Sequence, residues 1–132
     1  KVKDMITNDV FPVDPCAPVM VVSQQILKSG QDLVPVCDNG KLCGVITARD
    51  IAVSIVASAR DPVGVYAKSI MTNHFPTISP DDEILDAARL MVDRVAQMLL
   101  VIENGIVVGL LTLKDLARES PALAVTWSFV KP

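Results

Sequence analysis

The chain has 132 residues, a length typical of one compact domain that can bury a hydrophobic core. Hydrophobic residues make up 51% of the sequence and charged residues 20%, which excludes an intrinsically disordered chain, while the 4% of aromatic residues leaves the core to aliphatic side chains and methionine. The formal net charge is −3 at pH 7 and no run of Lys or Arg occurs, which argues against nucleic-acid and anionic-membrane binding.

Three cysteines, Cys16, Cys37 and Cys43, lack the regular spacing of a disulfide framework. The sequence has no secretory signal and no apolar run of the roughly 18 residues that a membrane span needs. We therefore expect a cytoplasmic protein. Because the chain begins at Lys1 rather than Met, we leave open that it is a piece of a larger protein with an effector domain.

The chain repeats itself, without a gap, when it is shifted by 65 residues. The identical pairs include Lys3/Lys68, Thr7/Thr72, Asn8/Asn73, Pro15/Pro80, Val36/Val101, Asn39/Asn104, Gly40/Gly105, Gly44/Gly109, Thr47/Thr112 and Asp50/Asp115. We expect one repeat over residues 1–60, a linker over 61–66, a second repeat over 67–120 and a tail over 121–132.

Each repeat opens with a short extended stretch, at residues 10–13 and 75–78. A helix is predicted to follow. Asp14 and Pro15 suit the N-cap and first helical positions of the first repeat, as Ser79 and Pro80 do in the second. Gly30 is suited to the left-handed conformation that ends a helix. Both predicted helices then carry an apolar stripe on one face.

A β-hairpin follows in each repeat. The predicted strands are residues 34–37 with 42–46, and 99–102 with 106–111. Asn-Gly between them, at 39–40 and 104–105, favours a type I′ turn, in which both central residues have positive φ. This register places Cys37 opposite Leu42 and Val36 opposite Cys43. Neighbouring residues on a strand point to opposite faces, so Cys37 and Cys43 are predicted to point apart and to form no disulfide.

A second helix, starting near Ala48 and near Leu113, closes each repeat. The order β-α-β-β-α, twice, predicts an α+β fold. One such repeat leaves an apolar sheet face uncovered. We therefore expect two repeats packed face to face.

The most distinctive motif is Gly44-Val-Ile-Thr47-Ala-Arg-Asp50, which returns as Gly109-Leu-Leu-Thr112-Leu-Lys-Asp115. Free amides and the dipole at a helix start favour an anion, a Thr hydroxyl can donate to phosphate, and an Asp can accept from both ribose hydroxyls. The same Thr-x-x-Asp spacing is also a capping box that needs no ligand, and the glycines can simply permit close packing. Both interpretations stay open on the residues alone.

Over residues 2–120, the two motif copies, the Asn-Gly hairpins and the order of elements resemble a tandem pair of CBS domains. The resemblance implies pseudo-twofold symmetry and a non-catalytic, regulatory module that senses AMP, ADP, ATP or S-adenosylmethionine in clefts between the two CBS repeats. The ligand-binding residues implied are Gly44, Thr47, Arg49, Asp50, Gly109, Thr112, Lys114 and Asp115, with Val13, Leu33, Ile78 and Met98 against the adenine, and Thr77.

The two repeats depart from the family pattern at two places. Thr77 is the hydroxyl residue expected before the first helix, but the first repeat has Pro12 there. Gly30 is the expected helix stop, but the second repeat has Val95. The two ligand sites are therefore expected to differ in affinity or in ligand.

The resemblance also implies a disc-like homodimer, for which the apolar segment 51–59 offers a surface. A structural dimerisation module with vestigial ligand pockets is the alternative interpretation. We expect no enzyme and no metal site, because His74 has no partner in sequence and Asp81, Asp82 and Glu83 suit the first turn of a helix. The tail over 122–130 alternates Val, Trp and Phe and is expected to be extended.

Overall fold

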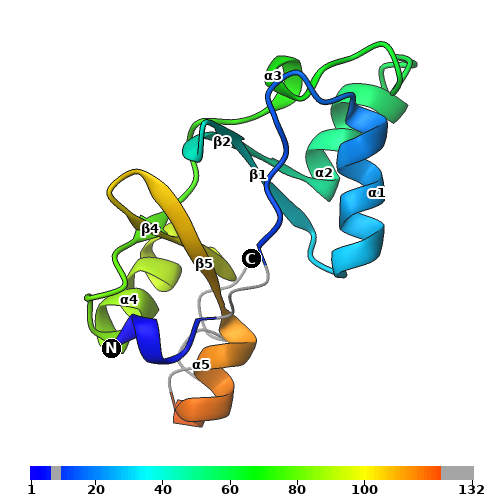
Figure 1. Cartoon of the computed structure of the whole chain (residues 1–132). Helices are drawn as coiled ribbons and strands as arrows, with labels where there is room; N and C mark the ends of the chain where they lie inside the picture. The colour runs from blue at the N-terminus through cyan, green and yellow to red at the C-terminus, as the bar shows by residue number, and fades with distance from the viewer. Residues whose placement is uncertain (7–9, 123–132) are drawn as a thin grey trace. The chain divides into compact units, whose positions relative to one another are not determined.

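The computed structural model describes residues 1–6 and 10–122 of the chain, and the tail prediction over 122–130 lies almost entirely outside them. The fold is mixed α+β, as predicted, and the chain divides into two compact units (Figure 1). One unit is Val10–Phe75. The other consists, among the described residues, of 1–6 and 76–122.

The Val10–Phe75 unit is built on an antiparallel hairpin. Its elements are α1 (Val19–Ser29), β1 (Leu33–Asp38), β2 (Lys41–Thr47), α2 (Ala48–Ile51), the π-helical η2 (Ala52–Val56) and α3 (Ala67–Ile70). Helix α1 contacts β1, and α2 continues directly from the end of β2 (Figure 1).

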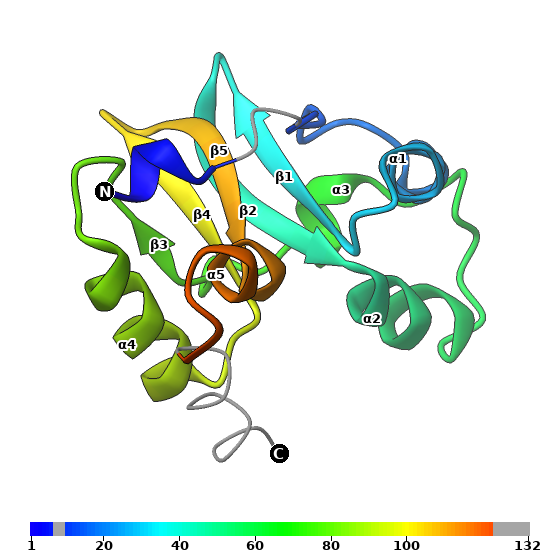
Figure 2. The ribbon, with the colours of Figure 1, turned by 90° about the horizontal axis from the view of Figure 1, so that it is seen from below.

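The second unit repeats this plan. Its elements are η1 (Val2–Asp4), β3 (Thr77–Ile78), α4 (Ile84–Arg94), β4 (Met98–Glu103), β5 (Ile106–Thr112) and α5 (Leu113–Glu119). Strand β3 runs parallel to β4, β4 pairs antiparallel with β5, and α5 follows directly from β5 (Figure 2).

Both hairpins turn at Asn-Gly as predicted, because both central residues have positive φ: 52° and 83° at Asn39 and Gly40, and 55° and 81° in the second repeat. The predicted register is right for Cys37, which lies opposite Leu42. It is wrong one step further along. A β-bulge makes Cys43 the extra residue and places Val36 opposite Gly44, and the second hairpin carries the same bulge.

The first helix of each repeat starts later than predicted. Helix α4 begins at Ile84 after Glu83, so Asp81, Asp82 and Glu83 precede the helix instead of forming its first turn. The cause is a local turn, in which the Ser79 amide donates to the Asp82 carboxylate at 3.0 Å. The first repeat behaves alike: Asp14 accepts from the Cys16 amide at 2.8 Å, and α1 begins only at Val19, after Pro18.

The helix ends follow the sequence more closely. Gly30 ends α1 in the left-handed conformation with φ of 72°, as predicted. Val95 ends α4 in the same conformation with φ of 50°, although it is β-branched. The fold therefore imposes one backbone geometry on both positions, whichever residue occupies them.

The opening segment of each repeat packs with the strands of the other repeat. Val2 in η1 is fully buried in a core with Ile78 and Leu99, while Ala67, which aligns with Val2 in the repeat, is fully buried with Val22 and Val34. Val2 N donates to Asp82 O at 2.9 Å, and Ala67 N donates to Ala17 O at 2.8 Å. The two segments are thus reciprocally exchanged, since each compact unit contains the first turn of the other repeat.

Among residues 1–6 and 10–122, no helix combines the length and the hydropathy that crossing a membrane requires.

Candidate functional site

Each sequence motif lies where a hairpin strand ends and a helix begins. Strand β2 ends at Thr47 and β5 at Thr112, and α2 and α5 start at the next residue. Strand pairing places Leu33 opposite Thr47 and Met98 opposite Thr112. Directly opposite residues project from the same sheet face. The structure thus gives each motif threonine one of the apolar neighbours expected from the sequence.

The other apolar candidates lie in the hydrophobic cores. Ile78 pairs with Val101, and both are buried in the core formed with α4. Met98 precedes Val101 by three positions on β4, so its side chain leaves the opposite face of the strand. In the first repeat, Val13 bridges Val36 and packs on the corresponding core. The side chains of Val13 and Ile78 therefore do not lie beside the motif threonines.

The side chain of Thr77 projects from the sheet face that carries Met98, whereas that of Ile78 projects from the other face. Thr77 is exposed and pairs with Leu100, which lies two positions from Met98 and therefore on the same face. Thr77, Met98 and Thr112 thus share one face of the second unit. Pro12, also exposed, stands at the corresponding position of the first repeat and offers no hydroxyl.

Both motifs form the capping box that their spacing allows. Asp50 Oδ2 accepts from the Thr47 amide at 2.8 Å, and Thr47 Oγ1 accepts from the Asp50 amide at 3.1 Å. The corresponding distances in the second repeat are 2.9 Å and 3.2 Å between Thr112 and Asp115. The structural explanation of Thr and Asp is therefore confirmed, and any ligand must bind to groups that already cap a helix.

The amides at the helix starts are less free than the sequence suggested. The first helical amide is also bonded, in the pairs Ala48 N to Asp32 O at 2.9 Å and Leu113 N to Gln97 O at 2.8 Å. Because the cap satisfies the third amide, only the second, in Arg49 or Lys114, has no hydrogen bond to the described residues. The expectation that several free amides bind a phosphate is wrong. Side chains must therefore supply most of the contacts to a phosphate.

Arg49 and Lys114 can supply that positive charge. Both are exposed, and neither forms an ion pair within the part of the chain that the structure describes. Each immediately precedes the motif aspartate. A flexible cation at this position can reach an anionic group held at the start of the helix.

The two motif aspartates differ in their surroundings. Asp115 is buried, and its second oxygen, Oδ1, accepts from Arg118 Nη2 at 3.0 Å. Thr112 Oγ1 also lies 3.0 Å from Asp115 Oδ2 and donates to it. Asp50 is half-buried, and the described residues offer its Oδ1 no such donor. The sequence reasoning missed Arg118, although its position three residues after Asp115 is the spacing of a helical ion pair.

Gly44 is required by close packing. A Cβ atom at this position would lie 2.8 Å from the Thr72 carbonyl oxygen and 3.0 Å from Met71 Sδ. Thr72 forms an antiparallel bridge with Val45, which fixes that approach. The packing interpretation of this glycine is therefore confirmed, and its aligned partner Gly109 is likewise buried in a strand.

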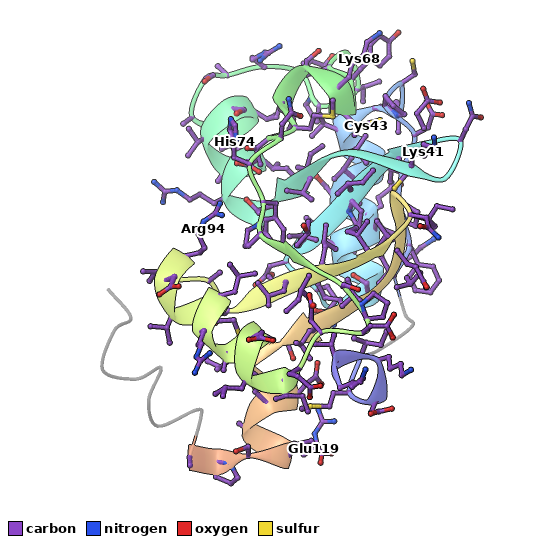
Figure 3. All side chains as sticks on the ribbon, turned by 90° about the vertical axis from the view of Figure 1, so that its left-hand side faces the viewer. Lys41, Cys43, Lys68, His74, Arg94 and Glu119 are labelled. Carbon is purple, nitrogen blue, oxygen red and sulfur yellow. The ribbon has the colours of Figure 1, made fainter. Side chains whose placement is uncertain are left out.

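The remaining polar candidates form no reactive cluster. His74 is exposed (Figure 3). Its backbone amide donates to Thr72 Oγ1 at 3.2 Å. All three cysteines are free thiols. Burial, together with the nearby Cys43 thiol, raises the pKa of Cys37 above its usual range. Across the described residues, no group of three or more His, Cys, Asp or Glu side chains is arranged to hold a metal ion.

Comparison with known proteins bears on both repeats. The chain is 29% identical over 130 residues to the CBS domain-containing protein YhcV of Bacillus subtilis, covering 95% of this chain and 92% of that protein. It is 28% identical over 127 residues to protein MK0525 of Methanopyrus kandleri, covering 95% of this chain but only 65% of the relative. The chain thus spans less than two thirds of the length of that second relative.

A solved structure is also similar to this chain over most of its length. The CBS domain pair of protein MJ0100, determined in complex with 5′-methylthioadenosine and S-adenosyl-L-methionine, superposes with a TM-score of 0.78. It is 26% identical in sequence, and the match covers 89% of this chain and 93% of that one. The family description "CBS domain" matches residues 2–57 and again residues 67–122. The chain therefore belongs to the CBS-domain family and contains two copies of the domain.

Proposed function

We propose that this chain is a regulatory, non-catalytic module that binds an adenosine-containing ligand, such as AMP, ADP, ATP or S-adenosylmethionine, at its two Gly-x-x-Thr-x-x-Asp motifs. The observation that carries the proposal is the pairing of each motif threonine with an apolar strand residue. At the end of a strand, Thr47 has Leu33 opposite it, and Thr112 has Met98. An apolar surface beside a hydroxyl, a carboxylate and a cation suits a nucleoside.

Each group has a distinct task in this proposal. The aspartate, Asp50 or Asp115, accepts from ribose hydroxyls while it continues to cap its helix. The exposed cation, Arg49 or Lys114, neutralises a phosphate or another charged substituent. Thr77 adds a hydroxyl that only the second repeat offers. The solved MJ0100 domain pair, which holds two adenosine compounds, supports this ligand class.

A ligand that shifts the population of two conformations passes its signal to an effector domain or a partner protein. Coupling requires that the ligand bind one conformation better than the other. We propose this chain as the sensing part of such a system, and the longer M. kandleri relative has room for further segments.

A thermal-shift screen tests the ligand class. The purified chain is heated with AMP, ADP, ATP, S-adenosylmethionine or 5′-methylthioadenosine, each in excess. A ligand specific for the folded state adds about 2.7 kcal/mol of stability at a hundredfold excess over its dissociation constant. Guanosine and uridine monophosphates serve as controls. The proposal predicts that at least one adenosine compound raises the melting temperature and that the control nucleotides leave it unchanged.

The variants Asp50→Asn and Asp115→Asn, made together, test the role of the aspartates. Asparagine keeps an oxygen that can cap the helix, but it replaces one carboxylate oxygen by a hydrogen-bond donor. The double variant is expected to unfold near the wild-type temperature without ligand and to lose most of the ligand-induced shift. An undiminished shift would rule out the proposed ribose contact.

A structural dimerisation module with vestigial pockets is the second candidate. Two observations favour it: the capping boxes account for Thr and Asp without a ligand, and α2 continues into the apolar surface of η2, where Val53 is 52% and Val56 74% exposed. A homodimer by light scattering that responds to no nucleotide would support this function. Val56→Glu is the variant expected to separate such a dimer.

A further inference from the structure

The aspartate of the second motif is fully engaged by its own chain. Asp115 Oδ2 accepts from the Thr112 amide at 2.9 Å and from Thr112 Oγ1 at 3.0 Å, and Oδ1 accepts from Arg118 Nη2 at 3.0 Å. Its side chain is only 10% exposed, whereas that of Arg118 is 69% exposed. A ribose approaching Asp115 therefore finds both carboxylate oxygens already hydrogen-bonded.

The aspartate of the first motif is engaged on one side only. Asp50 Oδ2 accepts from the Thr47 amide at 2.8 Å, while Oδ1 has no donor among the described residues. Thr47 Oγ1 accepts from the Asp50 amide, which leaves its hydroxyl proton available to a ligand. Val53 stands where the repeat places Arg118, and an apolar side chain cannot donate to the carboxylate.

The backbone beyond the two aspartates differs as well. After Asp50 the helix widens into the π-helical η2, closed by bonds from Ala57 N to Ala52 O at 2.8 Å and from Arg60 N to Ile55 O at 2.9 Å. After Asp115 the helix α5 continues as a regular α-helix to Glu119. The residue three positions after the motif aspartate therefore lies in a regular α-helix in the second repeat, where it is Arg118. In the first repeat it is Val53 and lies in the π-helical η2.

We propose that Arg118 is a specificity-determining residue that competes with the ligand ribose for Asp115, and that the Asp50 site is consequently the tighter of the two. This inference rests on the proposed function. A ligand at Asp50 gains a carboxylate oxygen that has no donor among the described residues, but a ligand at Asp115 must compete with a guanidinium for Oδ1. Because Arg118 is mostly exposed and its ion pair is screened by water, the expected difference is modest, about fivefold in dissociation constant.

The test uses variants that leave one site at a time. The full chain is titrated calorimetrically with AMP and, separately, with S-adenosylmethionine. Asp115→Asn isolates the Asp50 site, and Asp50→Asn isolates the Asp115 site, while asparagine preserves both caps. The dissociation constant is expected to be about five times lower in the Asp115→Asn protein than in the Asp50→Asn protein.

Arg118→Val then supplies the residue that the first repeat has at this position. In the Asp50→Asn background it is expected to tighten binding about fivefold. Arg89→Val in the same background is the matched control, because Arg89 forms an i,i+3 ion pair with Asp86 on α4 and is also 69% exposed. This control is expected to leave the dissociation constant unchanged.

Each remaining outcome decides the question. Equal constants for the two single-site proteins would overturn the ranking of the sites, and an unchanged constant or weaker binding after Arg118→Val would overturn the role of Arg118; either result leaves the proposed function intact. Weaker binding would instead make Arg118 a ligand contact. If the wild-type chain binds neither compound, the proposed function and this inference fail together.

Discussion

Gly30 and Val95 occupy equivalent positions, 65 residues apart, and both end a helix in the left-handed conformation, with φ of 72° and 50°. Glycine adopts this conformation freely, whereas an L-residue with a Cβ pays about 1–2 kcal/mol for it. A β-branched side chain is the least suited to it. Val95 thus stores backbone strain at the end of α4.

Val95→Gly is expected to stabilise the fold by about 0.5–1 kcal/mol, since relief of the strain exceeds the added entropy of the unfolded chain. The reciprocal change, Gly30→Val, is expected to destabilise it by about 1–2 kcal/mol. No atom lies within 4 Å of a Cβ built at Gly30, so only backbone strain enters. Urea denaturation measures both. A loss of stability in Val95→Gly would contradict this account.

Gly44→Ala is expected to destabilise the fold by about 1–3 kcal/mol, because the added methyl would lie 2.8 Å from the Thr72 carbonyl oxygen. Gly64→Ala is the control, since the nearest atom to a Cβ there, on Asp61, is 3.8 Å away. That variant should change stability by less than about 0.5 kcal/mol. Similar unfolding midpoints for the two alanine variants would show that the Thr72 segment can move aside.

Cys37 is expected to react more slowly with iodoacetamide than the exposed Cys16 at pH 8. Burial and the nearby Cys43 thiol raise the Cys37 pKa, and only the thiolate is the nucleophile. Because the folded state holds this proton more tightly than the unfolded state, the contribution to stability is complete below the unfolded pKa and is lost as the pH rises through the folded one. Mass spectrometry of alkylated protein between pH 7 and 10 follows each cysteine.

Cys43→Ser provides the check on that mechanism. Removing the neighbouring thiol is expected to move the reactivity of Cys37 toward lower pH, although burial keeps its pKa raised. If the Cys37 profile does not shift, burial alone sets the pKa.

Val2→Ala is expected to destabilise its own compact unit by about 2 kcal/mol, because the lost methyl groups leave a cavity in a core that is formed mainly by residues 76–122. Val63→Ala removes the same groups from a side chain that is 61% exposed and should have little effect. Urea denaturation again provides the comparison. Equal midpoints for the two variants would mean that η1 contributes little to that core.

The repeat, the hairpins and the motif positions could be predicted because they rest on local chemistry. Asn39 with Gly40 specifies a turn by itself, and Thr47 with Asp50 specifies a capping box. Because the sequence repeats after 65 residues, the Asn-Gly turn and the Thr-x-x-Asp spacing each occur twice.

Other features could not be predicted, because they depend on contacts that the local sequence does not encode. The bulge that makes Cys43 the extra residue lies beside Gly44, which is approached by Thr72 from far along the chain. The late start of α4 reflects a local turn in which the Ser79 amide donates to the Asp82 carboxylate and the Asp81 amide donates to Ser79 Oγ. The separation of Ile78 from Met98 onto opposite faces depends on the pairing of β3 with β4, which places Ile78 beside Val101 and which the local sequence does not specify.

The exchange of the first turns, which carry Val2 and Ala67, between the two repeats bears on how such a chain can arise. A single repeat whose first turn cannot fold onto its own strands must find a second copy that offers the missing contact, as in domain-swapped dimers. Duplication and fusion of its gene then turn that exchange between molecules into one within a molecule. An ancestor of one repeat would have been an obligate dimer, and half of the present chain, expressed alone, should associate with itself.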